Sequence, residues 1–161
     1  MKKIIHSLIL FPLFLMLLYC SPINEVKEDI LGYVDPFIGT GFHGHTFPGA
    51  TLPFGMVQLS PDTHLDGWDA SSGYHYDDHQ IHGFSHTHLS GTGIGDLGDV
   101  AFLPYSNSDE AVPVADLDKP SEIASPGYYK VLLKNFDVEV ELTATLRVGM
   151  HRYSFQDLFL L

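Results

Sequence analysis

The chain has 161 residues, of which 45% are hydrophobic, enough for one domain of ordinary size or for part of a larger one. Its formal net charge is −12, with 20 acidic side chains against 8 lysines and arginines. A nucleic-acid partner needs a basic face, so this balance argues against one. A single cysteine cannot form an internal disulfide, and we therefore expect a fold that does not rely on disulfide bonds.

Residues 1–19 are expected to be a signal peptide rather than part of the fold. Two lysines form a short basic region, and an almost unbroken apolar run follows at 4–18. Such a run is too short for a typical membrane-spanning helix and has the length of a signal-peptide core. The chain is therefore expected to be exported.

Cys20 stands directly after the apolar run. The sequence LLYC at 17–20 resembles a bacterial lipobox, although a small residue is usual where Tyr19 stands. We expect Cys20 to carry lipid and to anchor the protein in the membrane, at the periplasmic face or cell surface of a Gram-negative bacterium. Residues 20–32 are then a tether. Simple secretion and a retained anchor are the alternatives.

The stretch from Asp35 to Asp99 differs from the rest in composition. It holds eight of the ten histidines, twelve of the fifteen glycines and the only tryptophan. Glycine and proline exclude a regular helix or a central strand at 43–55. The segments expected to follow are a short strand at 56–60, a polar and aromatic loop at 66–78, possible strand character at 81–89, a glycine turn at 90–95, an apolar, buried strand at 99–104 and an exposed acidic excursion at 107–126.

The last third reads as a series of strands. Residues 128–133 are a strand candidate, and residues 138–145 alternate strictly between apolar and polar side chains. A hairpin turn is expected at 135–137, and another short strand at 150–155. No helical period of useful length follows the signal peptide, so the sequence predicts an all-β, antiparallel β-sandwich over 33–161.

The chain stops within an apolar run at 157–161, without a turn residue or a polar cap. An exposed apolar terminus of this kind invites pairing or aggregation. We expect the sequence to be a truncated piece of a longer protein.

Two pairs of histidines have i, i+2 spacing, His43 with His45 and His86 with His88. On a strand this spacing places both imidazoles on one face. Three interpretations stay open: a hydrogen-bonded cluster of loop side chains, contact with a sugar, and ligation of a transition metal if a carboxylate or third histidine converges on the pair.

Trp68 lies between Asp66 and Asp69 in a loop rich in glycine and tyrosine. An aromatic face beside carboxylates suits a carbohydrate, whose C–H groups stack on the ring while its hydroxyls bond to the acids. The alternative is a tryptophan packed in the core. The glycine run at 90–95 lacks the lysine of a phosphate-binding loop, and no G-x-S-x-G motif is present, so neither a nucleotide site nor a serine hydrolase is supported.

Several long motifs, in order, resemble the N-terminal domain of glycoside hydrolase family 92, the calcium-dependent, inverting α-mannosidases. They are YVDPFIGT (33–40), HGHTFPGA (43–50), PFGMVQ (53–58), DGWD (66–69), SGYHY (72–76), FSHTHLSGTG (84–93), SPGYY (125–129), ELTAT (141–145) and HRY (151–153). The resemblance covers residues 33–155 and departs at 156–161, where the family continues with further strands.

The resemblance implies a β-sandwich that packs on a C-terminal (α/α)₆ barrel, with the active site at their junction. In this family the catalytic glutamate and aspartate and most calcium ligands belong to the barrel, so no catalytic residue is expected in this chain. Trp68 and Asp69 are the residues expected to contact the sugar of a mannose-containing glycan, and His86 and His88 are weaker candidates.

Two function hypotheses compete with the mannosidase interpretation. One is a carbohydrate-binding or partner-docking module without catalysis. The other is a small histidine-based metalloprotein.

Overall fold

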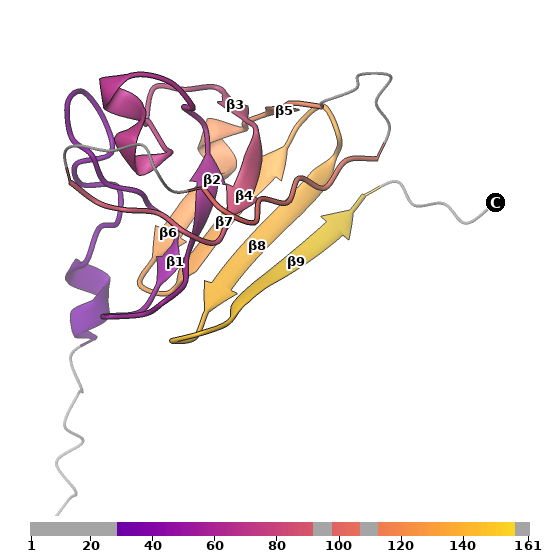
Figure 1. Ribbon diagram of the computed structural model, residues 1–161. Helices are drawn as coiled ribbons and strands as arrows, with labels where there is room; N and C mark the ends of the chain where they lie inside the picture. The colour runs from indigo at the N-terminus through magenta and orange to yellow at the C-terminus, as the bar shows by residue number, and fades with distance from the viewer. Residues whose placement is uncertain (1–28, 92–97, 107–112, 157–161) are drawn as a thin grey trace, which may run out of the picture.

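The computed structural model describes residues 29–91, 98–106 and 113–156. Over these ranges the fold is all-β with antiparallel pairing, as predicted, and the only helices are three short 3₁₀ turns (Figure 1). The expected signal peptide, the expected lipidation site at Cys20, the glycine turn beyond Gly91 and the final apolar run lie outside these ranges. None of the helices in the described part is long and apolar enough to cross a membrane.

The larger sheet has four strands in the order β6-β7-β8-β9. They are Ile123–Ser125, Tyr128–Leu133, Val138–Ala144 and Gly149–Phe155. The last three agree with the predicted strands to within one residue at each end. The predicted hairpin turn joins β7 to β8, with Asp137 at a positive φ of 51°. Alternation buries Val138, Val140 and Leu142 on one face.

The smaller sheets carry the histidine-rich half of the chain. β1 (Ala50–Thr51), β2 (Gln58–Asp62) and β4 (Gly83–Ser85) form one sheet, and β3 (Gln80–Ile81) pairs with β5 (Ala115–Asp116). One hydrophobic core includes side chains of all three sheets, and Figure 1 shows β1, β2 and β4 lying across β7 and β8. The two layers make the predicted sandwich.

Two predictions within the histidine-rich half were wrong in detail. The expected strand at 81–89 ends at Ser85 and is broken into β3 and β4. The apolar segment at 99–104 makes only an isolated bridge between Phe102 and Phe84, and Phe102 is 51% exposed. Val100 has a φ of 56°, which interrupts the extended backbone that a buried strand requires.

The acidic segment at 107–126 is not simply an exposed excursion. Its described part, 113–126, contains β5, the 3₁₀ turn η3 (Lys119–Ser121) and β6, and Ala115 and Leu117 are buried. The acidic and proline residues of this segment suggested a loop. Strands of two or three residues are also too short to show a readable alternation of apolar and polar side chains.

A buried polar network fixes the loop that leads into the candidate site. The hydroxyls of Tyr74 and Tyr129 both donate to Glu122 Oε1, at 2.8 and 2.6 Å, and Lys119 Nζ lies 3.1 Å from Glu122 Oε2. Burial, together with the negative charge of Glu122, raises the pKa of both tyrosines well above the ordinary value, so both hydroxyls remain protonated donors. The network joins the segment after Ser72 to β6 and β7.

Candidate functional site

The 3₁₀ turn η2 (Trp68–Ser72) places Trp68 and Asp69 at the surface. Trp68 is 58% exposed, so it is a surface side chain and not a core tryptophan. The imidazole of His45 meets the indole edge-on, with ring centroids 5.3 Å apart and planes at 89°. This contact braces the indole against His45. More than half of the surface of Trp68 stays accessible to a ligand.

Two histidines converge on the carboxylate of Asp69. His43 Nδ1 lies 3.0 Å from Asp69 Oδ1 and makes a hydrogen bond. His45 Nε2 lies 3.4 Å from the same oxygen, and this buried nitrogen makes no hydrogen bond in the described part of the chain. The hydrogen bond from His43 is the largest influence that holds the pKa of Asp69 below its usual range. Asp69 is therefore a charged acceptor at neutral pH.

A cavity of about 260 Å³ lies next to this turn, lined in part by Ser71, Ser72 and Gly73 at the end of η2. Asp62 and His88 line it from the strand side. Its lining mixes polar side chains with apolar ones such as Leu65 and Leu89.

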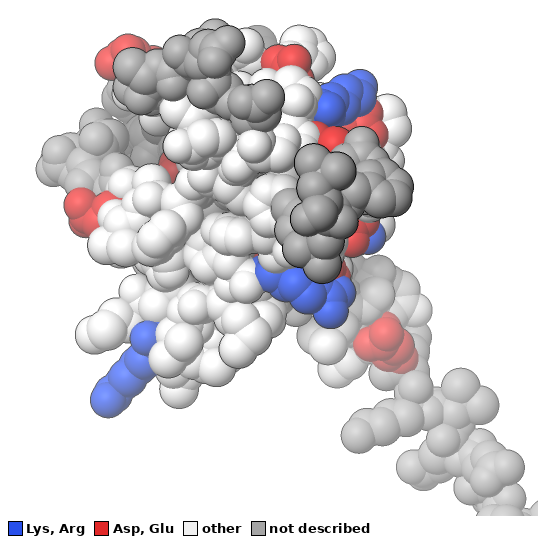
Figure 2. Space-filling view, turned by 90° about the vertical axis from the view of Figure 1, so that its right-hand side faces the viewer, with Lys and Arg blue, Asp and Glu red and all other residues white. Residues whose placement is uncertain are grey.

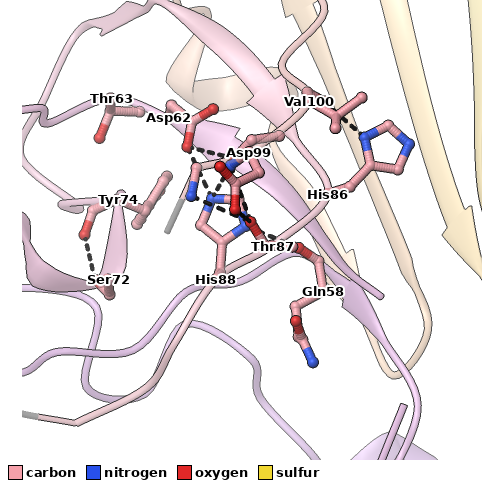
Figure 3. A network of polar contacts seen from close by, with 12 residues as sticks. Gln58, Asp62, Thr63, Ser72, Tyr74, His86, Thr87, His88, Asp99 and Val100 are labelled. Atoms are coloured by element: carbon pink, nitrogen blue, oxygen red, sulfur yellow. Dashed lines mark hydrogen bonds and ion pairs between the residues drawn. The ribbon is translucent and has the colours of Figure 1, made fainter. Parts of the chain in front are cut away.

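His88 belongs to a buried network behind the cavity (Figure 3). Its Nδ1 donates to the carbonyl oxygen of Gln58 at 2.8 Å, and its Nε2 lies 2.9 Å from Asp62 Oδ1. Ser85 Oγ also donates to Asp62 Oδ1, at 2.8 Å. A Cβ on Gly73 would lie 2.9 Å from the His88 ring, so only glycine lets the turn approach this imidazole. Both His88 nitrogens are thus engaged within the protein.

His86 lies apart from this group. Figure 3 shows His86 beside Val100, turned away from Asp62 and His88. Its Nδ1 donates to the Val100 carbonyl oxygen at 2.8 Å, and its ring packs against His151. The prediction that His86 and His88 share a face was wrong, because both residues follow the end of β4 and no longer alternate as strand residues do.

The structure thus brings Trp68 and Asp69 together, places His88 in the adjacent cavity wall and places His86 elsewhere. His43 and His45 were missed as members of the Asp69 cluster. Their spacing was visible in the sequence, but their partner lies 26 residues from His43, and no local pattern shows such a contact.

The described residues do not fit a calcium ion. Calcium takes six to eight oxygen ligands, with several carboxylates among them. The part of the chain that the structure describes holds no group of three or more histidine, cysteine, aspartate or glutamate side chains placed to bind a metal. Asp62, Asp69 and Asp78 are each paired with a histidine instead.

Comparison with known proteins identifies the chain as a glycoside hydrolase domain. Residues 33–158 match the model of the glycosyl hydrolase family 92 N-terminal domain. The chain belongs to this family.

Relatives of known structure have the same fold. A family GH92 α-mannosidase from Bacteroides thetaiotaomicron, also solved in complex with mannoimidazole, is 42% identical with a TM-score of 0.76 over 80% of this chain. A family GH92 inverting mannosidase from the VPI-5482 strain of that species is 26% identical, with a TM-score of 0.61 over 82% of this chain. A protein of Arthroderma benhamiae, described as an uncharacterized secreted glycosidase, is 34% identical over 81% of this chain. The chain spans less than a fifth of the length of each relative, 18–19%.

Proposed function

We propose that this chain is the sugar-contacting N-terminal domain of an exported α-mannosidase that hydrolyses α-mannosides of N-glycan or mannan type with inversion. The observation that carries the proposal is the exposed Trp68 beside the charged Asp69, in a chain 42% identical to an α-mannosidase. Trp68 offers an apolar face for the C–H groups of a mannose ring. Asp69 offers acceptor oxygens for its hydroxyls.

His43 and His45 act on the sugar through Asp69 in this proposal. His43 keeps the carboxylate ionised and fixes Oδ1, so Oδ2 is the oxygen that turns to a sugar hydroxyl. The unpaired Nε2 of His45 provides a further polar atom at the base of the site.

His88 supports the cavity wall, and contact with a sugar would require it to exchange one of its internal hydrogen bonds. His86 would reach a sugar only by leaving Val100. We therefore rank both below Trp68 and Asp69 as sugar-contacting residues. The sequence analysis gives the same order.

Catalysis is assigned to the longer protein. Inversion needs two carboxyl groups about 6.5–9.5 Å apart with a water between sugar and base. We place this pair, and the calcium ligands, in a C-terminal (α/α)₆ barrel outside this chain. The domain described here binds and orients the sugar and excludes water from one side of it, so alone it is expected to be inactive.

Export through the signal peptide at 1–19 and anchoring through lipidated Cys20 complete the proposal. Its support is the sequence of the N-terminus together with the relative described as secreted. Mass spectrometry of the membrane fraction tests it, since a diacylglycerol-modified N-terminal Cys20 is the expected species.

The main test uses the full-length enzyme that contains this domain. Trp68→Ala and Asp69→Asn are expected to lower kcat/KM on an α-mannoside by at least about tenfold each, because each removes a contact worth about 1.4 kcal/mol or more. Asp66→Asn is the matched control, since it removes a neighbouring acid outside the histidine cluster. Unchanged kinetics in both site variants would overturn the assignment of the sugar site.

The alternative function is a carbohydrate-binding or partner-docking module. The reading frame beyond codon 161 distinguishes the two, because both functions expect the 161-residue chain alone to be inactive. Mannoside binding by calorimetry without measurable hydrolysis, in an organism whose gene ends at this domain, would favour the module.

A further inference from the structure

An aromatic side chain stands beside the proposed sugar site at a turn position where glycine is ordinarily found. The backbone N–H of Gly44 donates to the Gly41 carbonyl oxygen at 3.0 Å, which closes a four-residue turn. Phe42 occupies the second position of this turn with a φ of 54°, a left-handed conformation that bulky side chains rarely adopt. The residue is 80% exposed, so its ring adds little to the core and is presented to solvent instead.

The backbone of Phe42 is held in this conformation by a histidine. The backbone N–H of Asp77 donates to His75 Nδ1 at 3.3 Å, so the proton of the neutral imidazole lies on Nε2. His75 Nε2 donates to the Phe42 carbonyl oxygen at 3.0 Å. His75 is itself anchored, because its backbone N–H donates to Thr63 Oγ1 at 2.8 Å. The turn that carries Phe42 is therefore tied to the segment after β2.

Phe42 and Trp68 each pack on one of the two histidines that converge on Asp69. The ring centroids of Phe42 and His43 are 4.2 Å apart, and His43 Nδ1 lies 3.0 Å from Asp69 Oδ1. Trp68 packs on His45, whose Nε2 lies 3.4 Å from the same oxygen. Both Phe42 and Trp68 are more than half exposed. One carboxylate is thus linked through an imidazole to each of two accessible aromatic rings.

Two accessible aromatic rings around one charged acceptor suit a chain of sugar units better than a single unit. Each unit of a glycan has a C–H face that can stack on an aromatic ring, and hydroxyls that can donate to a carboxylate. We propose that Phe42 binds the sugar unit adjacent to the one on Trp68, so that the site takes an oligosaccharide of at least two units. This inference rests on the proposed function, because it extends the sugar site at Trp68 and Asp69. Phe42 contacts the substrate and selects for chain length, and it takes no part in bond cleavage.

Phe54 offers a matched comparison for Phe42. It is fully exposed and has a φ of 58°, in the turn between β1 and β2. This turn is bonded to the β8–β9 turn, through the backbone N–H of Met56 and the carbonyl oxygen of Leu146. Phe54 therefore shares the exposure and backbone conformation of Phe42 but belongs to a different part of the surface.

The test compares two substrates of the full-length enzyme that contains this domain, α-mannosyl fluoride with one sugar unit and a linear α-mannotriose with three. Phe42→Gly removes the ring and suits the positive φ, so the fold is retained. We expect kcat/KM on the trisaccharide to fall about fivefold to tenfold, the effect of losing about 50 Å² of apolar contact. The loss should lie mainly in KM, because stacking on Phe42 is the same in the ground state and the transition state. The value for the fluoride should be unchanged, because its single unit does not reach Phe42.

Three further variants make the result specific. Phe42→Tyr keeps the aromatic face and should retain the kcat/KM of the wild type on the trisaccharide. Phe54→Gly should leave the ratio of the two kcat/KM values unchanged. Trp68→Ala, measured in parallel, should lower kcat/KM on the trisaccharide. If Phe42→Gly does not fold, Phe42→Asn takes its place, since asparagine also adopts a positive φ.

Two outcomes would overturn the role of Phe42. One is an unchanged ratio of the two kcat/KM values in Phe42→Gly, which includes an equal loss on both substrates caused by packing of the ring on another part of the enzyme. The other is an equal loss in Phe42→Tyr, which keeps the ring. Trp68→Ala separates this failure from failure of the proposed function. If Trp68→Ala lowers kcat/KM on the trisaccharide and Phe42→Gly does not, only the role of Phe42 is wrong, whereas unchanged kinetics in both variants would remove the sugar site itself.

Discussion

At the scale of single residues, Asp69 shows how the fold prepares an acceptor. Its carboxylate is partly exposed, and such a group ordinarily rotates among several positions in water. The hydrogen bond from His43 holds Oδ1 on one side, and the buried Nε2 of His45 lies 3.4 Å from the same oxygen. The proposed sugar site therefore depends on two residues that need not touch the sugar.

This dependence predicts a coupled effect of mutation in the full-length enzyme. His43→Gln should weaken mannoside binding by about threefold to tenfold, the usual range for one hydrogen bond. In an Asp69→Asn background the same change should have little further effect, because its partner is already altered. KM measured across this double-mutant cycle checks the prediction. Additive losses would show that His43 contacts the sugar directly.

His151 predicts a pH dependence of stability. Its folded-state pKa of about 4 lies below the ordinary value near 6.5, mainly because of burial. Between these pH values the unfolded chain binds more protons than the folded chain, so stability falls as pH decreases from about 6.5 to 4. Above pH 7 both states are neutral at this residue, and the effect is absent.

The measurement is the urea midpoint of the chain at pH 7.5 and pH 5. The wild type should lose more stability between these pH values than His151→Gln, which cannot be protonated there. An equal loss in both proteins would contradict the depressed pKa of His151. Phe102→Leu, which removes part of the cover over the ring, should give an intermediate loss.

At the scale of elements, the close approach of β1 to β2 depends on Gly49. A Cβ at this position would lie 2.2 Å from the Leu59 carbonyl oxygen and 2.4 Å from Ser60 Cβ. Neither the Leu59 backbone nor the Ser60 β-carbon can move without displacing β2. β2 carries Asp62, which holds His88 and Ser85.

Gly49→Ala is therefore expected to lower the free energy of unfolding by about 3 kcal/mol, at the upper end for an overpacked site. Gly32→Ala is the control, because nothing lies within 4 Å of a Cβ there, and its effect should stay within about 0.5 kcal/mol. Denaturant unfolding of both variants checks the prediction. A small effect at Gly49 would mean that β1 and β2 separate easily.

The elements also show what the sequence can predict. β7, β8 and β9 were readable because each has six or seven residues and alternates around a hairpin. β1, β3 and β5 have two residues each and could not be predicted from the sequence, since so short a pairing is decided by neighbours distant in sequence. The same reason hid the cluster at Asp69. Trp68 and Asp69 could be chosen from their motif, whereas the histidines that orient Asp69 needed the fold.

At the scale of the whole molecule, one face is largely uncharged (Figure 2). Met56 and Met150 are 71% and 63% exposed, and Phe54 is fully exposed. The backbone N–H of Met56 donates to the Leu146 carbonyl oxygen at 2.8 Å, which joins the loop before β2 to the β8–β9 turn. Large exposed apolar side chains of this kind suit a surface that another part of a protein covers.

The occupant implied by the proposed function is the rest of a longer polypeptide, since the relatives are about five times the length matched here. Met56 and Met150 should then be oxidised by peroxide readily in the 161-residue chain and several times more slowly in the full-length enzyme, because burial excludes the oxidant from the sulfur. Peptide mass spectrometry over a time course measures both rates. Both proteins unfolded in urea provide the reference rate. Equal rates in the two folded proteins would mean that Met56 and Met150 stay open to solvent, and that the rest of the proposed longer protein packs elsewhere on the sandwich.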